Sequence, residues 1–448
     1  MLSVSQAEAR CAQLIEAARK VGADAADALY VGDGSTSVQV RLGALEDVER
    51  SEGEEIGLRL FVGQRSASVS SSDLSREALL ALVERAVAMA REAPEDPYAG
   101  LAPQEKLIGG SGPDVEGDDG ADPSPALLKA RALEMEEIAR GHPGITNSEG
   151  AGLSAGRSVT ALATSHGFCR GYTTSGYSAS VSVLAGTGSG MQRDYATHSA
   201  RWFEDLDGPE ALGALAAKRA LARVGPGKLP SGTMPVVFDP RVGTSLVGHL
   251  IGAIIGAAVA RKTSFLLGRD GEPVFPEAIT IVDEPHRPRG LRSKPYDGEG
   301  LPTARRNLVT GGRLTGWLMD SASARQLGLE PTGHATRGIG GSPGASATNV
   351  DLLPGEASRA ALIADIERGL LVTELIGQGV NPVTGDYSRG ASGFAIENGE
   401  IAGPVAEITI AGNLIDMFRT MRAADDLEHR RAVNVPTLRI EGMMIAGA

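Results

Sequence analysis

Apolar and polar side chains alternate along much of the first half of the chain. Apolar residues take every second position in 38–42 and in 56–62, and small apolar residues alternate with Ser and Thr in 158–164 and 172–184. A period of two is typical of β-strands that bury one face. Because neighbouring strands follow one another without a helix between them, the pattern favours an antiparallel sheet over a βαβ arrangement.

Helical spacing of apolar residues flanks these strands. It begins after Ser5, after Asp73, after Ser124 and at Pro209, and each run places its apolar side chains on one face. The N-terminal part is therefore predicted to be an antiparallel sheet with helices on one face, which is an α+β arrangement.

Glycine and proline mark a boundary in the middle of the chain. With 448 residues the chain is too long for one ordinary core, and the segment 225–235 is rich in both residue types. We predict an N-terminal α+β domain over residues 1–224 and a second domain over residues 236–448. Short apolar runs separated by many turn signals predict that the second domain is β-rich.

An uncharged run over residues 243–260 is the longest apolar segment of the chain. Its length raises the possibility of a membrane helix, but Thr244, Ser245 and His249 dilute it and both flanks are basic, so no orientation signal emerges. The run fits a central buried helix of the second domain better. A lone histidine in such a helix is more often a hydrogen-bonded core residue than a ligand.

Three glycines recur at every fourth position of this run. Gly248, Gly252 and Gly256 therefore share one stripe of the predicted helix, although each costs about 1 kcal/mol relative to alanine in a helix interior. The simplest explanation is the close approach of a neighbouring backbone along the stripe.

Several segments resemble the TldD/PmbA metalloprotease family, formerly described as modulators of DNA gyrase. The residues around His249 resemble the helix that carries His-Glu-x-x-x-His in the catalytic TldD branch, with Thr244 and Ser245 in place of the first His and the Glu. The most specific matches are near the C-terminal end, and together the segments extend the resemblance over essentially the whole chain. The matching segments are 228–233, 244–249, 261–265, 371–394 and 396–414.

The resemblance also shows what this chain lacks. In the catalytic branch both His residues of the motif bind zinc, the Glu acts as general base, and a late cysteine is the third ligand. Here His249 alone remains, no cysteine follows Cys169, and the tail offers Asp425, Asp426 and His429 instead. A single imidazole cannot hold a catalytic zinc ion, which needs about three protein ligands. The resemblance therefore implies the PmbA branch, also called TldE, with no metal or other cofactor in this chain.

The function implied is that of a non-catalytic subunit. The partner would be a TldD-like catalytic subunit that holds the zinc ion, and the heterodimer would act on small unfolded or leader peptides in the cytoplasm. This chain would wall the cavity and bind extended peptide, for example by strand addition. The chain alone could form a homodimer.

Two other functions stay open. One is an autonomous hydrolase that uses no zinc, with Ser245 and His249 as a dyad one turn apart. The other is a regulatory protein that acts on a topoisomerase. The formal net charge of −13 argues against direct binding of nucleic acid.

Candidate contacts for substrate lie in a polar loop of the second domain. Asp386, Tyr387 and Arg389 could form either a turn network or a substrate contact. The acidic loop 113–122 lacks the ligand order of an EF-hand, and the glycine-rich segment 332–348 lacks a phosphate-binding motif.

The cysteine count indicates a reducing compartment. The two cysteines form no metal-binding spacing, and the first residues lack a basic stretch followed by an apolar one. We therefore expect a cytoplasmic protein without membrane association.

Overall fold

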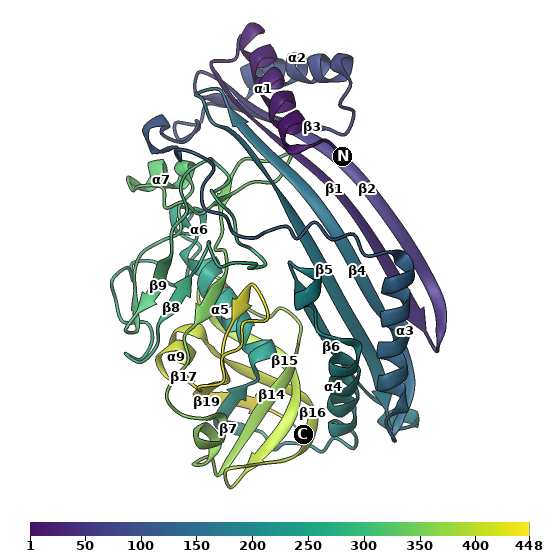
Figure 1. The fold of residues 1–448 in the computed structure, drawn as a ribbon. Coiled ribbons are helices and arrows are strands. Elements are labelled where there is room, and N and C mark those ends of the chain that lie inside the picture. Colours follow the sequence, from purple (N-terminus) through teal and green to yellow (C-terminus); the bar gives the residue numbers. More distant parts are fainter. Residues whose placement is uncertain (448) are drawn as a thin grey trace.

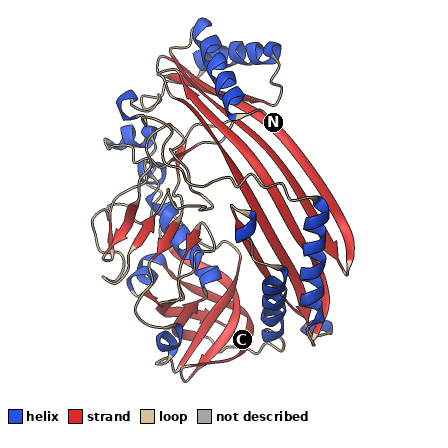
Figure 2. Cartoon of the chain, viewed as in Figure 1, coloured by secondary structure: helices blue, strands red, loops and turns tan. Residues whose placement is uncertain are grey.

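The computed structural model describes residues 1–447 and has two halves that lie side by side (Figure 1). The N-terminal half is built on one sheet of long antiparallel strands in the order β3-β2-β1-β4-β5-β6. Figure 2 shows how much longer these strands are than those of the other half. The strands are β1 Ala25–Arg41, β2 Ala44–Val62, β3 Arg65–Ser71, β4 Ile145–Thr164, β5 Cys169–Ala185 and β6 Gln192–Ala200.

Helices cover one face of this sheet. Even-numbered residues of β1, such as Ala28 and Val38, are buried under the helices, and odd-numbered residues of β4, such as Ala161 and Leu153, share that face. The opposite face carries Leu29 and contacts the C-terminal half. The predicted antiparallel sheet with helices on one face is confirmed. The helices are α1 Val4–Lys20, α2 Arg76–Glu92, α3 Pro125–Gly141 and α4 Pro209–Ala222.

The C-terminal half contains a closed ring of strands. In the order β16-β15-β14-β7-β19, each strand pairs with the next, and β16 also pairs with β19. The only parallel pair of the ring, within the described residues, joins β14 to β7. The ring strands are β7 Gly232–Phe238, β14 Arg368–Ile376, β15 Asp386–Glu397, β16 Glu400–Asn413 and β19 Leu438–Ala446.

Short strands and helices complete this half. A second sheet has the order β10-β9-β8-β13-β18. The remaining elements of this half are β8 Ile281–Asp283, β9 Arg306–Thr310, β10 Arg313–Leu314, α7 Ser321–Leu327, β11 Ala335–Thr336, β12 Gly344–Ala345, β13 Val350–Leu352, α8 Arg359–Ile363, α9 Leu414–Arg419, β17 Arg422–Ala423 and β18 Val433–Asn434. The N-terminal half also has 3-10 turns at Gln104–Lys106, Gly188–Gly190 and Phe203–Asp205. The predicted β-rich character is confirmed.

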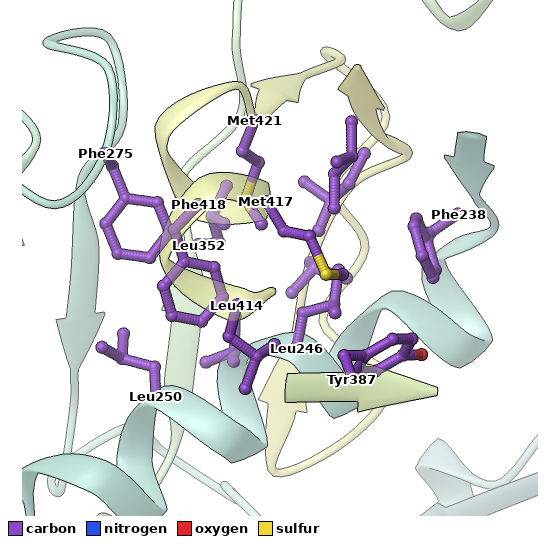
Figure 3. Close-up of a cluster of buried hydrophobic side chains, with 14 of the residues drawn as sticks. Phe238, Leu246, Leu250, Phe275, Leu352, Tyr387, Leu414, Met417, Phe418 and Met421 are labelled. Carbon is purple, nitrogen blue, oxygen red and sulfur yellow. The ribbon is translucent and has the colours of Figure 1, made fainter. Parts of the chain in front are cut away.

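Helix α5, Pro240–Ile254, packs one side against the core of the C-terminal half. Asp239 caps the helix by accepting a hydrogen bond from the Arg241 backbone N–H, and Pro240 begins it. Leu246 and Leu250 are fully buried and join the cluster of Figure 3, to which Phe418 and Tyr387 also belong. The helix is therefore central to this half but buried on one side only.

The prediction of one helix over residues 243–260 is wrong, because the chain leaves the helix at Ile255. A short helix, α6 Gly256–Ala260, follows. Ile255 is extended (φ −68°, ψ 129°) and forms a bridge with Leu318. Gly256 N donates to Leu318 O (2.8 Å), and Leu318 N donates to Ile254 O (2.9 Å). These bonds to another segment replace those that would continue the helix.

The expectation of a packed glycine stripe is wrong for two of its three members. Gly248 and Gly252 are exposed, and a Cβ atom on either meets nothing within 4 Å in the part of the chain that is described. A Cβ on Gly256 would lie 2.4 Å from Met319 Sδ and 2.6 Å from Ser323 Oγ. Close approach therefore explains Gly256, whereas Gly248 and Gly252 lie on the open side of α5.

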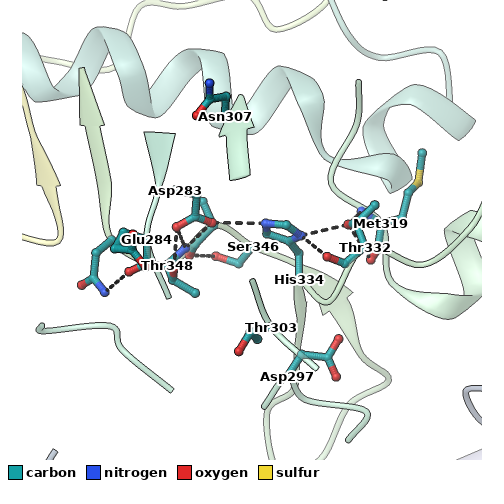
Figure 4. A network of polar contacts seen from close by, with 12 residues as sticks. Asp283, Glu284, Asp297, Thr303, Asn307, Met319, Thr332, His334, Ser346 and Thr348 are labelled. Carbon is teal, nitrogen blue, oxygen red and sulfur yellow. Dashed lines mark hydrogen bonds and ion pairs between the residues drawn. The ribbon is translucent and has the colours of Figure 1, made fainter. Parts of the chain in front are cut away.

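Buried polar contacts hold the glycine-rich segment 332–348 in place. His334 Nε2 lies 3.2 Å from Asp283 Oδ2, and its Nδ1 lies 2.8 Å from the Thr332 carbonyl oxygen (Figure 4). The Thr348 backbone N–H donates to the same Asp283 carboxylate (3.0 Å). The segment is thus part of the scaffold.

No helix within residues 1–447 is long and apolar enough to cross a membrane.

Candidate functional site

A cleft between the two halves contains the start of helix α5. One cavity of this cleft has a volume of about 290 Å³ and is lined from β6, the end of α4, α5, β14 and β15. A neighbouring cavity of about 330 Å³ shares Arg241 and Thr244 with it and reaches the tail residue Asp426. The lining residues of the first cavity are Arg193, Asp194, Tyr195, Arg223, Arg241, Val242, Thr244, Ser245, Thr373, Glu374, Leu375 and Arg389.

An ion pair joins the halves at the floor of this cavity. Arg241 of α5 donates two hydrogen bonds, of 2.7 and 3.1 Å, to the carboxylate of Asp194 on β6. The side chains are 9% and 2% exposed, so water screens the pair little. Burial by itself raises the pKa of Asp194, but the hydrogen bonds and charge of Arg241 outweigh burial and hold the pKa below its usual range. Asp194 is therefore a carboxylate at neutral pH and fixes the position of α5.

A second group of polar contacts links α4 to the strand ring. Arg223, which caps the C-terminal end of α4, forms an ion pair with Glu374 and donates a 3.1 Å hydrogen bond to Ser392 Oγ. The Ser392 hydroxyl donates to Glu374 Oε2 (3.0 Å), and Arg193 lies 3.7 Å from the other carboxylate oxygen. Both carboxylates of the cavity are thus engaged by arginines.

Thr244 and Ser245 stand where the family resemblance places the first His and the Glu of the zinc motif. Both side chains line the cavity. The Ser245 hydroxyl donates to the Val242 carbonyl oxygen one turn earlier (2.7 Å), and not to His249. A serine in this state is not activated by a base, and the proposed dyad of Ser245 and His249 has no support in the geometry.

His249 packs against Tyr387 beside the cavity. Their ring centroids are 6.1 Å apart at an interplanar angle of 78°, and neither His249 Nε2 nor the Tyr387 hydroxyl has a hydrogen-bond partner within residues 1–447. Burial and the positive charge of Arg389 both lower the pKa of His249, so the imidazole is neutral at physiological pH. Burial raises the pKa of Tyr387 to about 12, so its hydroxyl keeps its proton.

The prediction that Asp386, Tyr387 and Arg389 lie in a polar loop is wrong, because all three belong to strand β15, which pairs with β16 from Asp386 onward. Tyr387 and Arg389 lie two residues apart on β15 and so share a face. Asp386 is exposed and accepts hydrogen bonds from Thr384 Oγ1 (2.6 Å) and Asn413 Nδ2 (3.1 Å). Asp386 therefore belongs to a turn network, while Arg389 lines the cavity together with Thr244 and Ser245.

The donor set around His249 does not fit a zinc ion. Its neighbours are an aromatic ring, an arginine and a serine whose hydroxyl is engaged. Among residues 1–447, no group of three or more His, Cys, Asp or Glu side chains is arranged to hold a metal. Asp426 accepts hydrogen bonds from Thr437, and His429 lies 3.2 Å from Asp351, so both tail residues are engaged elsewhere.

Most residues of this cavity have no signal in the local sequence. Asp194, Arg223 and Glu374 come from three distant segments, and no local spacing connects them. Arg241 is the one with a local signal, because it follows Asp239 and Pro240, which predict the start of a helix.

This architecture is that of a known class of metallopeptidases. Three family models match successive parts of the chain: PmbA/TldA metallopeptidase domain 1 at residues 26–90, the central domain at 118–224 and the C-terminal domain at 231–447. The chain belongs to the PmbA/TldD metallopeptidase family.

Individual relatives cover the whole chain. It is 40% identical to Metalloprotease PmbA of Escherichia coli O157:H7, over 100% of this chain and 99% of that protein. It is 39% identical to the Metalloprotease PmbA homolog of Haemophilus influenzae, over 97% and 94%. The Metalloprotease TldD homolog of the same organism is 28% identical over 50% of this chain and 48% of that protein.

Solved structures share the fold. A candidate modulator of DNA gyrase from Bacteroides thetaiotaomicron superimposes with a TM-score of 0.91 at 28% identity and covers 100% of both chains. TldE from Thermococcus kodakarensis superimposes with a TM-score of 0.87 at 22% identity and covers 98% of this chain and 100% of that chain.

Proposed function

We propose that this chain is the non-catalytic, TldE-like subunit of a heterodimeric zinc metallopeptidase. The observation that carries the proposal is the start of helix α5. It lines a cleft, as a catalytic helix would, but offers Thr244, Ser245 and a single imidazole in place of a zinc site. Zinc and the general base would then come from a TldD-like partner subunit.

The remaining role of the chain is to hold the substrate. Its cleft is rich in hydrogen-bonding side chains and lies between two halves that buried ion pairs fix in place. Small unfolded or leader peptides are substrates that such a cleft could accept in an extended form, since their backbone groups are not yet paired. The presence of both a PmbA homolog and a TldD homolog in Haemophilus influenzae supports the pairing of two different chains.

We place this activity in the cytoplasm. Cys11 and Cys169 are both free thiols, which is the usual state of cysteines in a reducing compartment.

Reconstitution with the TldD relative from the same genome tests the proposal. We expect the purified chain to hold well under one zinc ion and to hydrolyse no peptide. The mixture should form a complex of one chain of each kind, measured by light scattering, and should cleave unfolded peptides until a chelator removes the zinc. Substitution of the Glu in the zinc motif of the TldD relative should abolish cleavage, whereas Ser245→Ala in this chain should not abolish it.

Three results would contradict the proposal. They are stoichiometric zinc in the isolated chain, failure of the two chains to associate, and hydrolysis by the isolated chain that resists chelators. Loss of that last activity in Ser245→Ala would favour the autonomous hydrolase.

A further inference from the structure

The cavity beside Thr244 and Ser245 is positively charged, in contrast to the chain as a whole. Four arginines and two carboxylates line it, whereas the full sequence has a net charge of −13. Asp194 is engaged by Arg241 and Arg223, and Glu374 by Arg223 and Arg193. Both negative charges are therefore already neutralised within the cavity.

Arg389 is the arginine that this network leaves out. Its guanidinium lines the cavity from β15, its Nε is buried without a hydrogen-bond partner, and no carboxylate of residues 1–447 lies within ion-pair distance of it. Removing a charge from water without a partner is costly, so a half-buried, unpaired guanidinium requires an explanation.

Other donors around Arg389 also lack acceptors. Thr373, which is 6% exposed and lines the same cavity, has a hydroxyl group without a partner in the described chain. The Tyr387 hydroxyl, in a side chain that is 1% exposed, faces Arg389, which can only donate, so the Tyr387 O–H also has no acceptor within residues 1–447. Nearly all buried polar side chains in proteins are hydrogen-bonded. A guanidinium without a carboxylate partner and two hydroxyl groups whose O–H has no acceptor indicate a ligand that accepts hydrogen bonds and carries negative charge.

We propose that this cavity binds the carboxylate of a peptide and that Arg389 is its anchoring residue. A guanidinium matches a planar carboxylate with two parallel hydrogen bonds, a geometry that lysine cannot supply. The volume of about 290 Å³ is at the small end of ligand pockets, and it suits the end of a peptide or one acidic side chain. The identity of the ligand as a peptide rests on the proposed function; the anion-binding character rests on the cavity alone.

Binding of matched peptides to the full chain tests the proposal without the catalytic partner. One peptide sequence is prepared with a free C-terminal carboxylate, as the C-terminal amide, and as the amide with one glutamate added. Affinities are measured by calorimetric titration. If only the peptide with the free C-terminal carboxylate binds, the ligand is a C-terminal carboxylate. If the amide with the added glutamate binds and the plain amide does not, the ligand is an acidic side chain.

Arg389→Met should weaken binding of the carboxylate peptide by at least about tenfold, because a hydrogen-bonded charge is lost. The affinity for the C-terminal amide peptide should be the same in Arg389→Met and in the wild type. Arg389→Lys should recover only part of the affinity. Arg368→Met is the matched control, since Arg368 is an exposed arginine on the neighbouring strand β14, away from this cavity. Arg389→Met should melt no lower than the wild type, because it removes an unpaired charge, whereas a merely structural arginine would lower the melting temperature.

Four results would overturn the proposal. Arg389→Met could bind every peptide as the wild type does, or no peptide could distinguish carboxylate from amide. Inorganic phosphate could bind with the same dependence on Arg389 while the peptides do not, which would make the site a phosphate site. Finally, the substitution could weaken only association with the TldD relative, which would assign Arg389 to the subunit interface. The heterodimer could still form and cleave peptides in each case, so these failures are separate from failure of the proposed function.

Discussion

Gly252 on the open side of helix α5 and Gly256 at the packed start of α6 should respond in opposite ways to the same substitution. Gly252→Ala adds a methyl group that meets nothing within 4 Å in residues 1–447. Alanine is better than glycine in a helix interior by about 1 kcal/mol, so the variant should be more stable by up to that amount. Gly256→Ala places its methyl group 2.4 Å from Met319 Sδ and 2.6 Å from Ser323 Oγ. Overpacking of this kind costs about 1–3 kcal/mol.

Hydrogen exchange of the α5 and α6 amides in the isolated chain measures both effects locally. A gain of 1 kcal/mol in the free energy of opening slows exchange about fivefold, and the loss at Gly256 should speed it by at least the same factor. Gly248→Ala is the control and should behave as Gly252→Ala does. Faster exchange or a lower melting temperature in Gly252→Ala would refute the reasoning, because it would mean that the open side of α5 is packed in solution.

Two further predictions concern buried charges. Burial raises the pKa of Glu299 from 4.5 to about 7, although Ser321 donates to its carboxylate. The folded state therefore holds this proton more tightly than the unfolded state, and the stability that it contributes, on the order of 3 kcal/mol, is present at pH 4.5 and lost as the pH rises through about 7. Glu299→Gln cannot titrate at this position. The melting temperature of the variant should therefore rise relative to that of the wild type as the pH increases from 5 to 8. A difference between the two melting temperatures that does not change with pH would contradict this. Asp194→Ala leaves Arg241 buried without its main partner and should cost about 3–5 kcal/mol in calorimetric unfolding, whereas a loss below about 1 kcal/mol would show that the ion pair does not join the halves.

Local periodicity was enough to predict the N-terminal fold. A strand with one buried face must alternate, whatever it packs against, and a helix with one buried face must repeat near every fourth residue. The sequence alone also determines which chemistry is missing from α5. Thr244 cannot bind zinc as the first His of the motif would, and Ser245 cannot act as general base as the Glu would, whatever the fold around them.

Tertiary structure decided everything that depends on a partner distant in sequence. The break at Ile255 results from hydrogen bonds to Leu318, and the exposure of Gly252 results from the direction in which α5 packs. Asp386 and Arg389 lie three residues apart in the same polar stretch. Arg389 lines the cavity, whereas Asp386 is hydrogen-bonded to the turn that precedes β15. Asp194 and Arg241 meet only because β6 and α5 face each other across the two halves. A cleft is formed by contacts between segments that are distant in sequence. Such contacts require no regular spacing of residues within either segment, so no local pattern predicts them.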